Sequence, residues 1–144
     1  MKKITLTCAH AIVKYLIAQK ILINGKKEPL FPGVFGIFGH GNVACLGQAL
    51  EENQKELPTY RGHHEQNMAL TGIGYARAKR RQQIFVATSS VGPGATNMIT
   101  AAAVAMSNRL PILFGALRMG VVFFSLLPFT VNELSKFFVH RIYF

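Results

Sequence analysis

The sequence predicts a three-layer α/β fold in which helices cover both faces of a mostly parallel β-sheet. Two short apolar runs, at 33–38 and 83–88, lack the alternation of a half-exposed strand and are typical of strands buried on both faces. Each run leads into a glycine-rich turn and then into a segment with helical features. This repetition of strand, turn and helix favours an open, doubly wound sheet.

The N-terminal third is expected to open with an amphipathic helix over 7–21. Ile12 and Leu16 recur there at helical spacing. Thr7 or Thr5 is the candidate N-cap. The elements expected after this helix are a turn at Asn24-Gly25, a strand at 33–38, a glycine-rich turn at 39–42 and a helix at 43–50.

The central part of the chain is predicted to alternate between strands and helices. The clearest buried strand is 83–88, which is polar only at its two ends. The segment 95–106 is predicted to be a helix, and it is apolar on nearly every side. The other elements expected here are a short strand at 57–60, a helix at 65–79, a turn at 89–94 and a last strand at 110–114.

Residues 115–144 do not continue this pattern. They hold six of the eleven phenylalanines and show neither alternation nor a helical period across 121–129. Such a segment would be prone to aggregate if it were exposed. We therefore expect one domain at 1–114, incomplete at its C-terminus, and a non-native or truncated tail from a displaced reading frame. A C-terminal amphipathic helix that docks on a partner is the alternative.

A net charge of +10 raises the question of a nucleic-acid or membrane partner. The basic run at 77–81 is interpreted as a solvated helix end, with a phosphate-binding patch as the alternative. The chain lacks the interleaved exposed aromatics of a nucleic-acid surface. Its longest apolar run, 119–131, is shorter than the roughly 20 residues that span a bilayer. We expect no nucleic-acid partner, no membrane partner and a cytoplasmic location.

Cysteine and histidine patterns predict neither a disulfide scaffold nor a metal site. Cys8 and Cys45 are the only cysteines, too few for a disulfide framework. His63 and His64 are adjacent, so their side chains diverge on a strand or a helix. No metal ligands are assigned in this chain.

Glu65 is the most informative single residue. It is one of six acidic residues, all glutamates, and it opens a run of small and apolar residues that predicts a buried helix. A buried carboxylate needs a partner, because desolvation disfavours its charged form. The glycine-rich turns at 39–42 and 92–97 are expected at the same sheet edge, so all three would face one crevice. A first-turn acid facing the helix dipole is the alternative interpretation.

Several sequence motifs, taken in their order along the chain, resemble those of one protein family. They are Ile-Phe-Gly-His-Gly-Asn-Val at 37–43, His-Glu-Gln at 64–66, Met-Ala-x-x-Gly-x-x-Tyr-Ala-Arg at 68–77, Ala-Thr-Ser-Ser-Val-Gly-Pro-Gly-Ala-Thr-Asn-Met at 87–98 and Arg-Leu-Pro-Ile-Leu at 109–113. Over 3–114 the chain resembles the pyrimidine-binding domain of thiamine-diphosphate enzymes of the acetolactate synthase group. Within that group it is most similar to a branch that hydrolyses a C–C bond of a cyclic 1,2-diketone in inositol catabolism.

This resemblance implies a catalytic role for Glu65, which in the family bonds a ring nitrogen of the cofactor's aminopyrimidine and so activates the thiazolium carbon. Burial is expected to raise the pKa of this carboxyl and to strengthen that bond. Gly39, His40 and Asn97 are implied as further cofactor-binding residues. The cofactor would be thiamine diphosphate, with Mg²⁺ held by a domain absent from this chain. The site would form between subunits of a homo-oligomer.

Two departures from the family pattern bear on function. Asn67 stands where glycine is expected and would crowd the helix start beside the cofactor. The Gly-Asp-Gly pattern of the diphosphate-binding domain is absent, so this chain by itself is expected to be inactive. A fragment of an acetolactate synthase-like lyase or decarboxylase, and a non-catalytic binding module, are the alternative interpretations.

Overall fold

A four-stranded parallel sheet forms the centre of the computed structural model, which describes residues 4–116. The strands follow the order β4-β3-β5-β6, and all three pairings are parallel. In chain order the elements are α1 (Cys8–Ala18), β1 (Lys20–Ile23), β2 (Lys26–Pro29), β3 (Val34–Gly36), η1 (Val43–Gly47), α2 (Gln48–Glu52), β4 (Thr59–Arg61), α3 (Glu65–Ala78), β5 (Val86–Ser89), α4 (Pro93–Asn97), α5 (Ile99–Ser107) and β6 (Leu113–Ala116).

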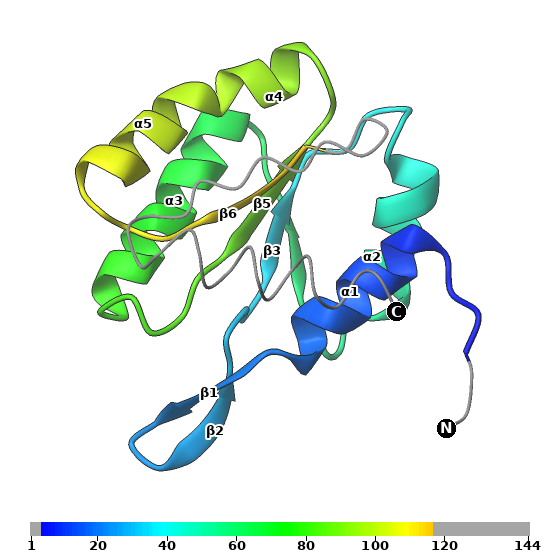
Figure 1. Ribbon diagram of the computed structural model, residues 1–144. Coiled ribbons are helices and arrows are strands. Elements are labelled where there is room, and N and C mark those ends of the chain that lie inside the picture. Colours follow the sequence, from blue (N-terminus) through cyan, green and yellow to red (C-terminus); the bar gives the residue numbers. More distant parts are fainter. Residues whose placement is uncertain (1–3, 117–144) are drawn as a thin grey trace.

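Helices lie on both faces of this sheet, as the sequence predicts (Figure 1). Helices α1 and α2 cover one face, and α3, α4 and α5 cover the other. Successive strand residues point to opposite faces, so Val86 packs in a cluster with Val13 of α1, whereas Ala87 packs in a cluster with Ile73 and Ala101 of α3 and α5. Burial on both faces explains why the run 84–87, which leads into β5, is apolar without alternation.

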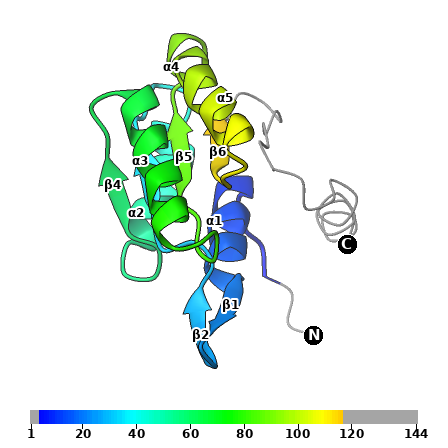
Figure 2. The same cartoon turned by 90° about the vertical axis from the view of Figure 1, so that its left-hand side faces the viewer.

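The predicted turn at Asn24-Gly25 is confirmed, but it joins two strands that were not predicted. Strands β1 and β2 form an antiparallel hairpin that projects away from the main sheet (Figure 2). Asn24 and Gly25 have φ angles of 50° and 78°, the left-handed values that a tight hairpin turn requires at both central residues. Helix α1, capped at Thr7, consequently ends at Ala18 rather than at residue 21.

The helix predicted over 95–106 is present, and it is buried on one side only. Ala101 and Ala105 are fully buried, but Ile99 is 62% exposed and Met106 is 70% exposed. The segment covers the sheet with one side only, so an apolar composition on all sides did not indicate burial on all sides.

Two predicted helices are also divided. Met98 separates α4 from α5. The segment 43–50 begins as the π-helical turn η1 and only then continues as α2. The remaining strands and helices occur where the sequence predicts them, with ends that differ by a few residues.

Strand β6 extends past the boundary expected at residue 114. Its backbone pairs with β5 as far as Ser89 and Ala116, and the Thr88 hydroxyl donates a hydrogen bond of 2.6 Å to the Gly115 carbonyl. Residues 117–144 lie outside the described residues, and so does the expectation of a non-native tail. Within 4–116, none of the helices has the length and apolar character needed to traverse a bilayer.

A chain of side-chain contacts ties the start of α1 to α2. The Thr7 hydroxyl lies 2.7 Å from His10 Nδ1, and His10 Nε2 lies 2.8 Å from Glu52 Oε2. Gln48 donates a third bond, of 3.0 Å, to Glu52 Oε1. These hydrogen bonds from Glu52's neighbours hold the pKa of its carboxyl below its ordinary value, with the His10 bond as the largest cause.

We predict opposite effects for alanine at two glycines. A Cβ on Gly33 would lie 2.8 Å from the Phe85 ring and 3.0 Å from the Pro58 carbonyl, so Gly33→Ala should lower the free energy of unfolding by about 1–3 kcal/mol. Gly74, inside α3, has nothing within 4 Å of the same position. Gly74→Ala should therefore raise the free energy of unfolding by about 0.5–1 kcal/mol. Urea titrations measure both, and equal effects would contradict this account of the packing.

The Glu52 contacts predict a pH-dependent contribution to stability. Because the folded-state pKa lies below the ordinary value of 4.5, the folded protein binds fewer protons at this site than the unfolded chain. The contribution is present above pH 4.5 and is lost as the pH falls through the folded-state pKa. The difference in unfolding free energy between the wild type and Glu52→Gln should therefore shrink as urea titrations move from pH 6 to lower pH. A difference that grows on acidification would contradict the assignment.

Candidate active site

One edge of the sheet gathers the segments that the sequence singles out. Because β3 and β5 are parallel, their carboxyl ends lie at the same edge. The turn 39–42 follows β3, and the turn 90–92 follows β5 and leads into α4. Helix α3 begins at Glu65, shortly after β4 ends, and reaches the same edge (Figure 1). Ligands of open α/β sheets bind at this kind of edge.

Glu65 is the first residue of α3, as predicted, and it is neither fully buried nor exposed. The preceding His64 caps the helix, its Nδ1 accepting the Asn67 backbone N–H at 3.3 Å, and its side chain is exposed. The apolar run that Glu65 opens is buried one turn later, from Met68 onward. The carboxylate therefore lies at the rim of the core, where solvent still reaches it.

The partner of Glu65 is Asn97, the last residue of α4. Its amide Nδ2 donates a hydrogen bond of 2.9 Å to Glu65 Oε2. The other carboxylate oxygen, Oε1, lies against the backbone of Gly94, where an added Cβ would be only 3.1 Å away. Glycine at this position thus leaves room for the carboxylate to approach the turn.

The pKa of Glu65 is lowered, which corrects the expectation that burial would raise it. The hydrogen bond from Asn97 is the largest cause, and a bond from Glu65's own backbone N–H adds to it. Desolvation acts in the opposite direction but is outweighed, because the carboxylate is only half-buried. Glu65 is therefore ionised at neutral pH and able to accept a hydrogen bond.

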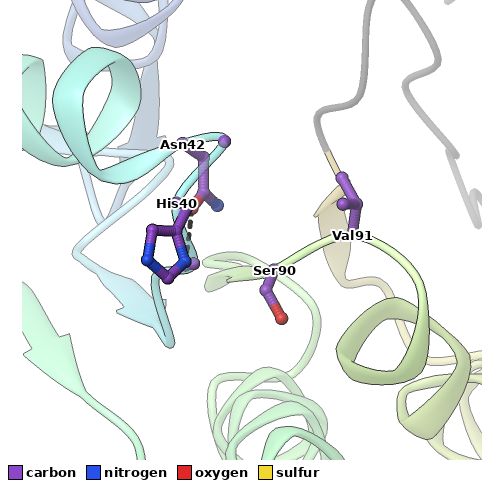
Figure 3. Close-up of a pocket in the computed structure, with 6 residues that line it drawn as sticks. His40, Asn42, Ser90 and Val91 are labelled. Atoms are coloured by element: carbon purple, nitrogen blue, oxygen red, sulfur yellow. Dashed lines mark hydrogen bonds between the residues drawn. The ribbon is translucent and has the colours of Figure 1, made fainter.

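The turn 39–42 forms one wall of a cleft near the Glu65 carboxylate, and the start of the turn after β5 forms the other. A cavity of about 350 Å³ is lined by Gly39, His40, Gly41, Asn42, Ser90 and Val91. Figure 3 shows His40 and Asn42 on one side of the cleft and Ser90 and Val91 on the other. Gly39 and His40, two of the predicted site residues, thus belong to the cleft and make no hydrogen bond to Glu65 within the described chain.

Asn42 joins the two turns and was not singled out from the sequence. Its Oδ1 accepts the Gly39 N–H at 2.8 Å, and its Nδ2 donates to the Ser89 carbonyl at 3.0 Å. The side chain is 3% exposed, so both bonds are shielded from water. The bond to Gly39 is local, because it reaches a backbone N–H only three residues earlier, a short-range contact that asparagine side chains commonly make. The bond to Ser89 spans two strands and leaves no signal in the sequence.

Two further expectations concern the crowding of the α3 start by Asn67 and the metal ligands of the chain. Asn67 has an exposed side chain in the first turn of α3, and its crowding of a cofactor there stays a prediction. Across residues 4–116, no three His, Cys, Asp or Glu side chains come together in a group that could hold a metal ion.

Comparison with known proteins gives a matching family model and several similar hydrolases. Residues 28–119 match the family described as "Thiamine pyrophosphate enzyme, N-terminal TPP binding domain". A 3D-(3,5/4)-trihydroxycyclohexane-1,2-dione hydrolase of Geobacillus thermodenitrificans is 53% identical over 113 residues. Hydrolases of the same name from Listeria innocua and Clostridium tetani are 50% and 49% identical over the same length.

These alignments cover 78% of this chain but only 18% of each relative, so the chain spans less than a fifth of their length. The family match covers most of the described structure, including both glycine turns, Glu65 and Asn97. The chain therefore belongs to the family of the N-terminal TPP-binding domain of thiamine pyrophosphate enzymes.

Proposed function

We propose that this chain is the pyrimidine-binding part of a thiamine-diphosphate-dependent C–C hydrolase that opens the ring of 3D-trihydroxycyclohexane-1,2-dione in inositol catabolism. The identity of about half over 113 residues to hydrolases of that name supports the substrate class. The catalytic part of this proposal is supported by the Glu65 carboxylate, which lies at the carboxyl edge of the sheet and accepts a hydrogen bond from Asn97 through one of its oxygens.

The arrangement around Glu65 fits an aminopyrimidine. Asn97 donates its hydrogen bond to Glu65 Oε2, so Glu65 Oε1 can still accept a hydrogen bond from a protonated ring nitrogen. Gly94 leaves the space beside Oε1 free of a side chain. The lowered pKa keeps the carboxylate as an acceptor near neutral pH. A charge-assisted bond of this kind is stronger than one between neutral groups.

In the proposed mechanism, each residue has a separate task. Glu65 accepts a hydrogen bond from the pyrimidine ring and stabilises its protonated form. Asn97 orients the carboxylate, since its bond fixes which oxygen faces the ligand. The bound cofactor would act as an electron sink for cleavage of the C–C bond. We propose that Mg²⁺ and the diphosphate are held by a further domain of the enzyme, within a homo-oligomer.

A chimeric enzyme tests the function. The 113-residue segment of the Geobacillus hydrolase would be replaced by the matching segment of this chain. We expect the chimera to hydrolyse the trihydroxylated cyclic diketone and not to condense or decarboxylate pyruvate. Activity on pyruvate alone would replace the proposal with an acetolactate synthase-like function. A folded chimera that binds thiamine diphosphate but acts on neither substrate would reject it.

In this chimera, Glu65→Gln should lower kcat by about a hundredfold or more, because an amide stabilises the protonated ring far less than a carboxylate. The fold should be retained, as shown by an unchanged thermal midpoint. Glu51→Gln is the matched control, since Glu51 is exposed on α2, which packs on the opposite face of the sheet from α3. Turnover near the wild-type rate in Glu65→Gln would reject the catalytic role.

The 144-residue chain alone should bind thiamine diphosphate only weakly. A pyrimidine contact at Glu65 leaves the charged diphosphate without an anchor, so most of the binding free energy is missing. Calorimetry in the presence of Mg²⁺ should give a dissociation constant weaker than about 1 mM, which corresponds to about −4 kcal/mol. A constant near 1 μM would show that this chain contains the whole site.

A further inference from the structure

The C-terminal ends of α3 and α5 carry a group of exposed cations that the function proposed above does not use. Arg77 lies in the last turn of α3, Lys79, Arg80 and Arg81 follow it, and Arg109 lies two residues after the end of α5. Residues 66–116 contain these five cations and no Asp or Glu. Within residues 4–116, none of the five forms an ion pair with a carboxylate. We call these five residues the arginine cluster.

A hydrogen bond joins the two helix ends. Arg81 Nε donates to the Arg109 carbonyl at 2.8 Å, across 28 positions of sequence. Helices α3 and α5 lie side by side on one face of the sheet, where Ile73 and Ala101 belong to one apolar cluster (Figures 1 and 2). Strands β5 and β6 begin after these helix ends, so the arginine cluster lies at the amino edge of the sheet, opposite the edge with Glu65.

Both helices end with an arginine in the left-handed backbone conformation. The φ angle is 52° at Arg80, after α3, and 52° at Arg109, after α5. Each residue completes a Schellman motif, the helix ending in which glycine is the usual residue. The hydrogen bonds of the two motifs run from the Arg80 and Arg81 N–H groups to the Arg77 and Ala76 carbonyls (3.1 and 2.8 Å), and from the Arg109 and Leu110 N–H groups to the Met106 and Ala105 carbonyls (3.2 and 2.9 Å). A Cβ in this conformation crowds a neighbouring carbonyl oxygen, so the backbone favours glycine over arginine here.

Side-chain contacts do not offset the strain at these two positions. Within residues 4–116, the side chains of Arg80 and Arg109 form no hydrogen bond and no ion pair. A cation near a helix C-terminus interacts favourably with the helix dipole, but Arg77 and Lys79 already supply that charge at α3. The guanidinium groups of Arg80 and Arg109 are therefore available to an anion outside the described chain.

The chemistry of the arginine cluster favours phosphate groups. A guanidinium presents a planar fork of N–H donors that matches two phosphate oxygens, and four of the five cations are arginines. The other residues of 77–82 are Ala78 and Gln82, so this stretch offers no aromatic ring for base stacking and no large apolar side chain to enter a membrane. The cations also lie at only two adjacent helix ends, which is a short surface for a polymer.

We propose that the arginine cluster is a binding site for a small polyphosphate, a soluble ligand with two or more linked phosphate groups. Arg80 and Arg109 bind it from the two helix ends, and Arg81 holds these ends together through its bond to the Arg109 carbonyl. The site lies at the opposite edge of the sheet from Glu65 and does not depend on the function proposed above.

Calorimetry with the 144-residue chain tests this site directly. The probe is inorganic tripolyphosphate, titrated without Mg²⁺ at about 50 mM salt. We expect saturable binding of one tripolyphosphate per chain, about tenfold or more tighter than orthophosphate, because the longer anion reaches cations on both helix ends. Raising the salt to about 200 mM should weaken binding, because the charges are exposed and screened. Equal affinity for the two anions, or no saturable binding of tripolyphosphate, would overturn the proposal.

Variants of Arg80 separate the charge of the side chain from the strain of the backbone. Arg80→Ala and Arg80→Gly should each weaken tripolyphosphate binding about fivefold, because both remove one guanidinium. Only Arg80→Gly should raise the thermal midpoint, by about 2–4 °C, because glycine relaxes the left-handed position. A lower midpoint in Arg80→Gly would overturn the proposal, since stability alone would then explain the arginine.

Lys55→Ala is the matched control. Lys55 is exposed in the turn after α2, a helix on the opposite face of the sheet from α3, and its loss removes one positive charge outside the arginine cluster. Tripolyphosphate binding should stay unchanged in this variant. Equal weakening in Lys55→Ala and Arg80→Ala would show a general effect of net charge and overturn the proposal, as would unchanged binding in Arg80→Ala.

A single-stranded DNA oligonucleotide and vesicles that contain phosphatidylserine are the competing ligands. Each should bind more weakly than tripolyphosphate when concentrations are expressed per phosphate group. Tighter binding of the DNA or of the vesicles, lost in Arg80→Ala, would assign the surface to a nucleic acid or a membrane and overturn the proposal. Because this site is measured by binding to the chain alone, its failure leaves the activity of the chimeric enzyme as a separate test of the proposed function.

Discussion

The candidate site depends first on the two hydrogen bonds of the Asn42 side chain. One bond closes the turn after β3 onto the Gly39 N–H, and the other reaches the Ser89 carbonyl at the end of β5. The strands alone bring the two turns to one edge, but they do not fix the conformation of the turns. Because Asn42 is almost fully buried, breaking either bond would leave a backbone group unsatisfied away from water.

Glycine positions complete this arrangement by allowing side chains to come close to the backbone. Gly39 and Gly94 both face Ser90, and Gly94 also faces Glu65. Neither glycine has a positive φ, so space rather than backbone conformation requires glycine at these two positions. Glycine at these two positions therefore reflects how closely the turns, the Ser90 hydroxyl and the Glu65 carboxylate are packed, whereas Gly92 has a φ of 72° and no atom close to where its Cβ would lie.

The electrostatics of Glu65 follow from its place at the rim of the core. A carboxylate buried in apolar surroundings would have a raised pKa, whereas one that accepts bonds from Asn97 and its own backbone N–H has a lowered pKa. Half-burial keeps the desolvation small enough for the hydrogen bonds to dominate. A group that must accept a hydrogen bond from a ligand at neutral pH is better served by this balance than by full burial.

The sequence by itself determined the α/β class, the parallel sheet and the family. Apolar strands followed by glycine-rich turns are local patterns, and the order of the motifs around Glu65 is enough to identify the thiamine-diphosphate group. The turn at Asn24-Gly25 was likewise local, because both residues adopt left-handed φ values readily. The apolar composition of 95–106 did not reveal which side of the helix the sheet covers, and burial alone gave the wrong direction for the Glu65 pKa shift.

Only the tertiary structure decided how the site is assembled. The Asn97–Glu65 bond joins residues 32 positions apart, and the Asn42–Ser89 bond joins residues 47 positions apart. The direction of the Glu65 pKa shift depends on the first of these bonds, and the placement of the two turns against each other depends on the second. A pattern along the chain records which residues are present, whereas hydrogen bonding and desolvation depend on distances that only the packed sheet and helices set.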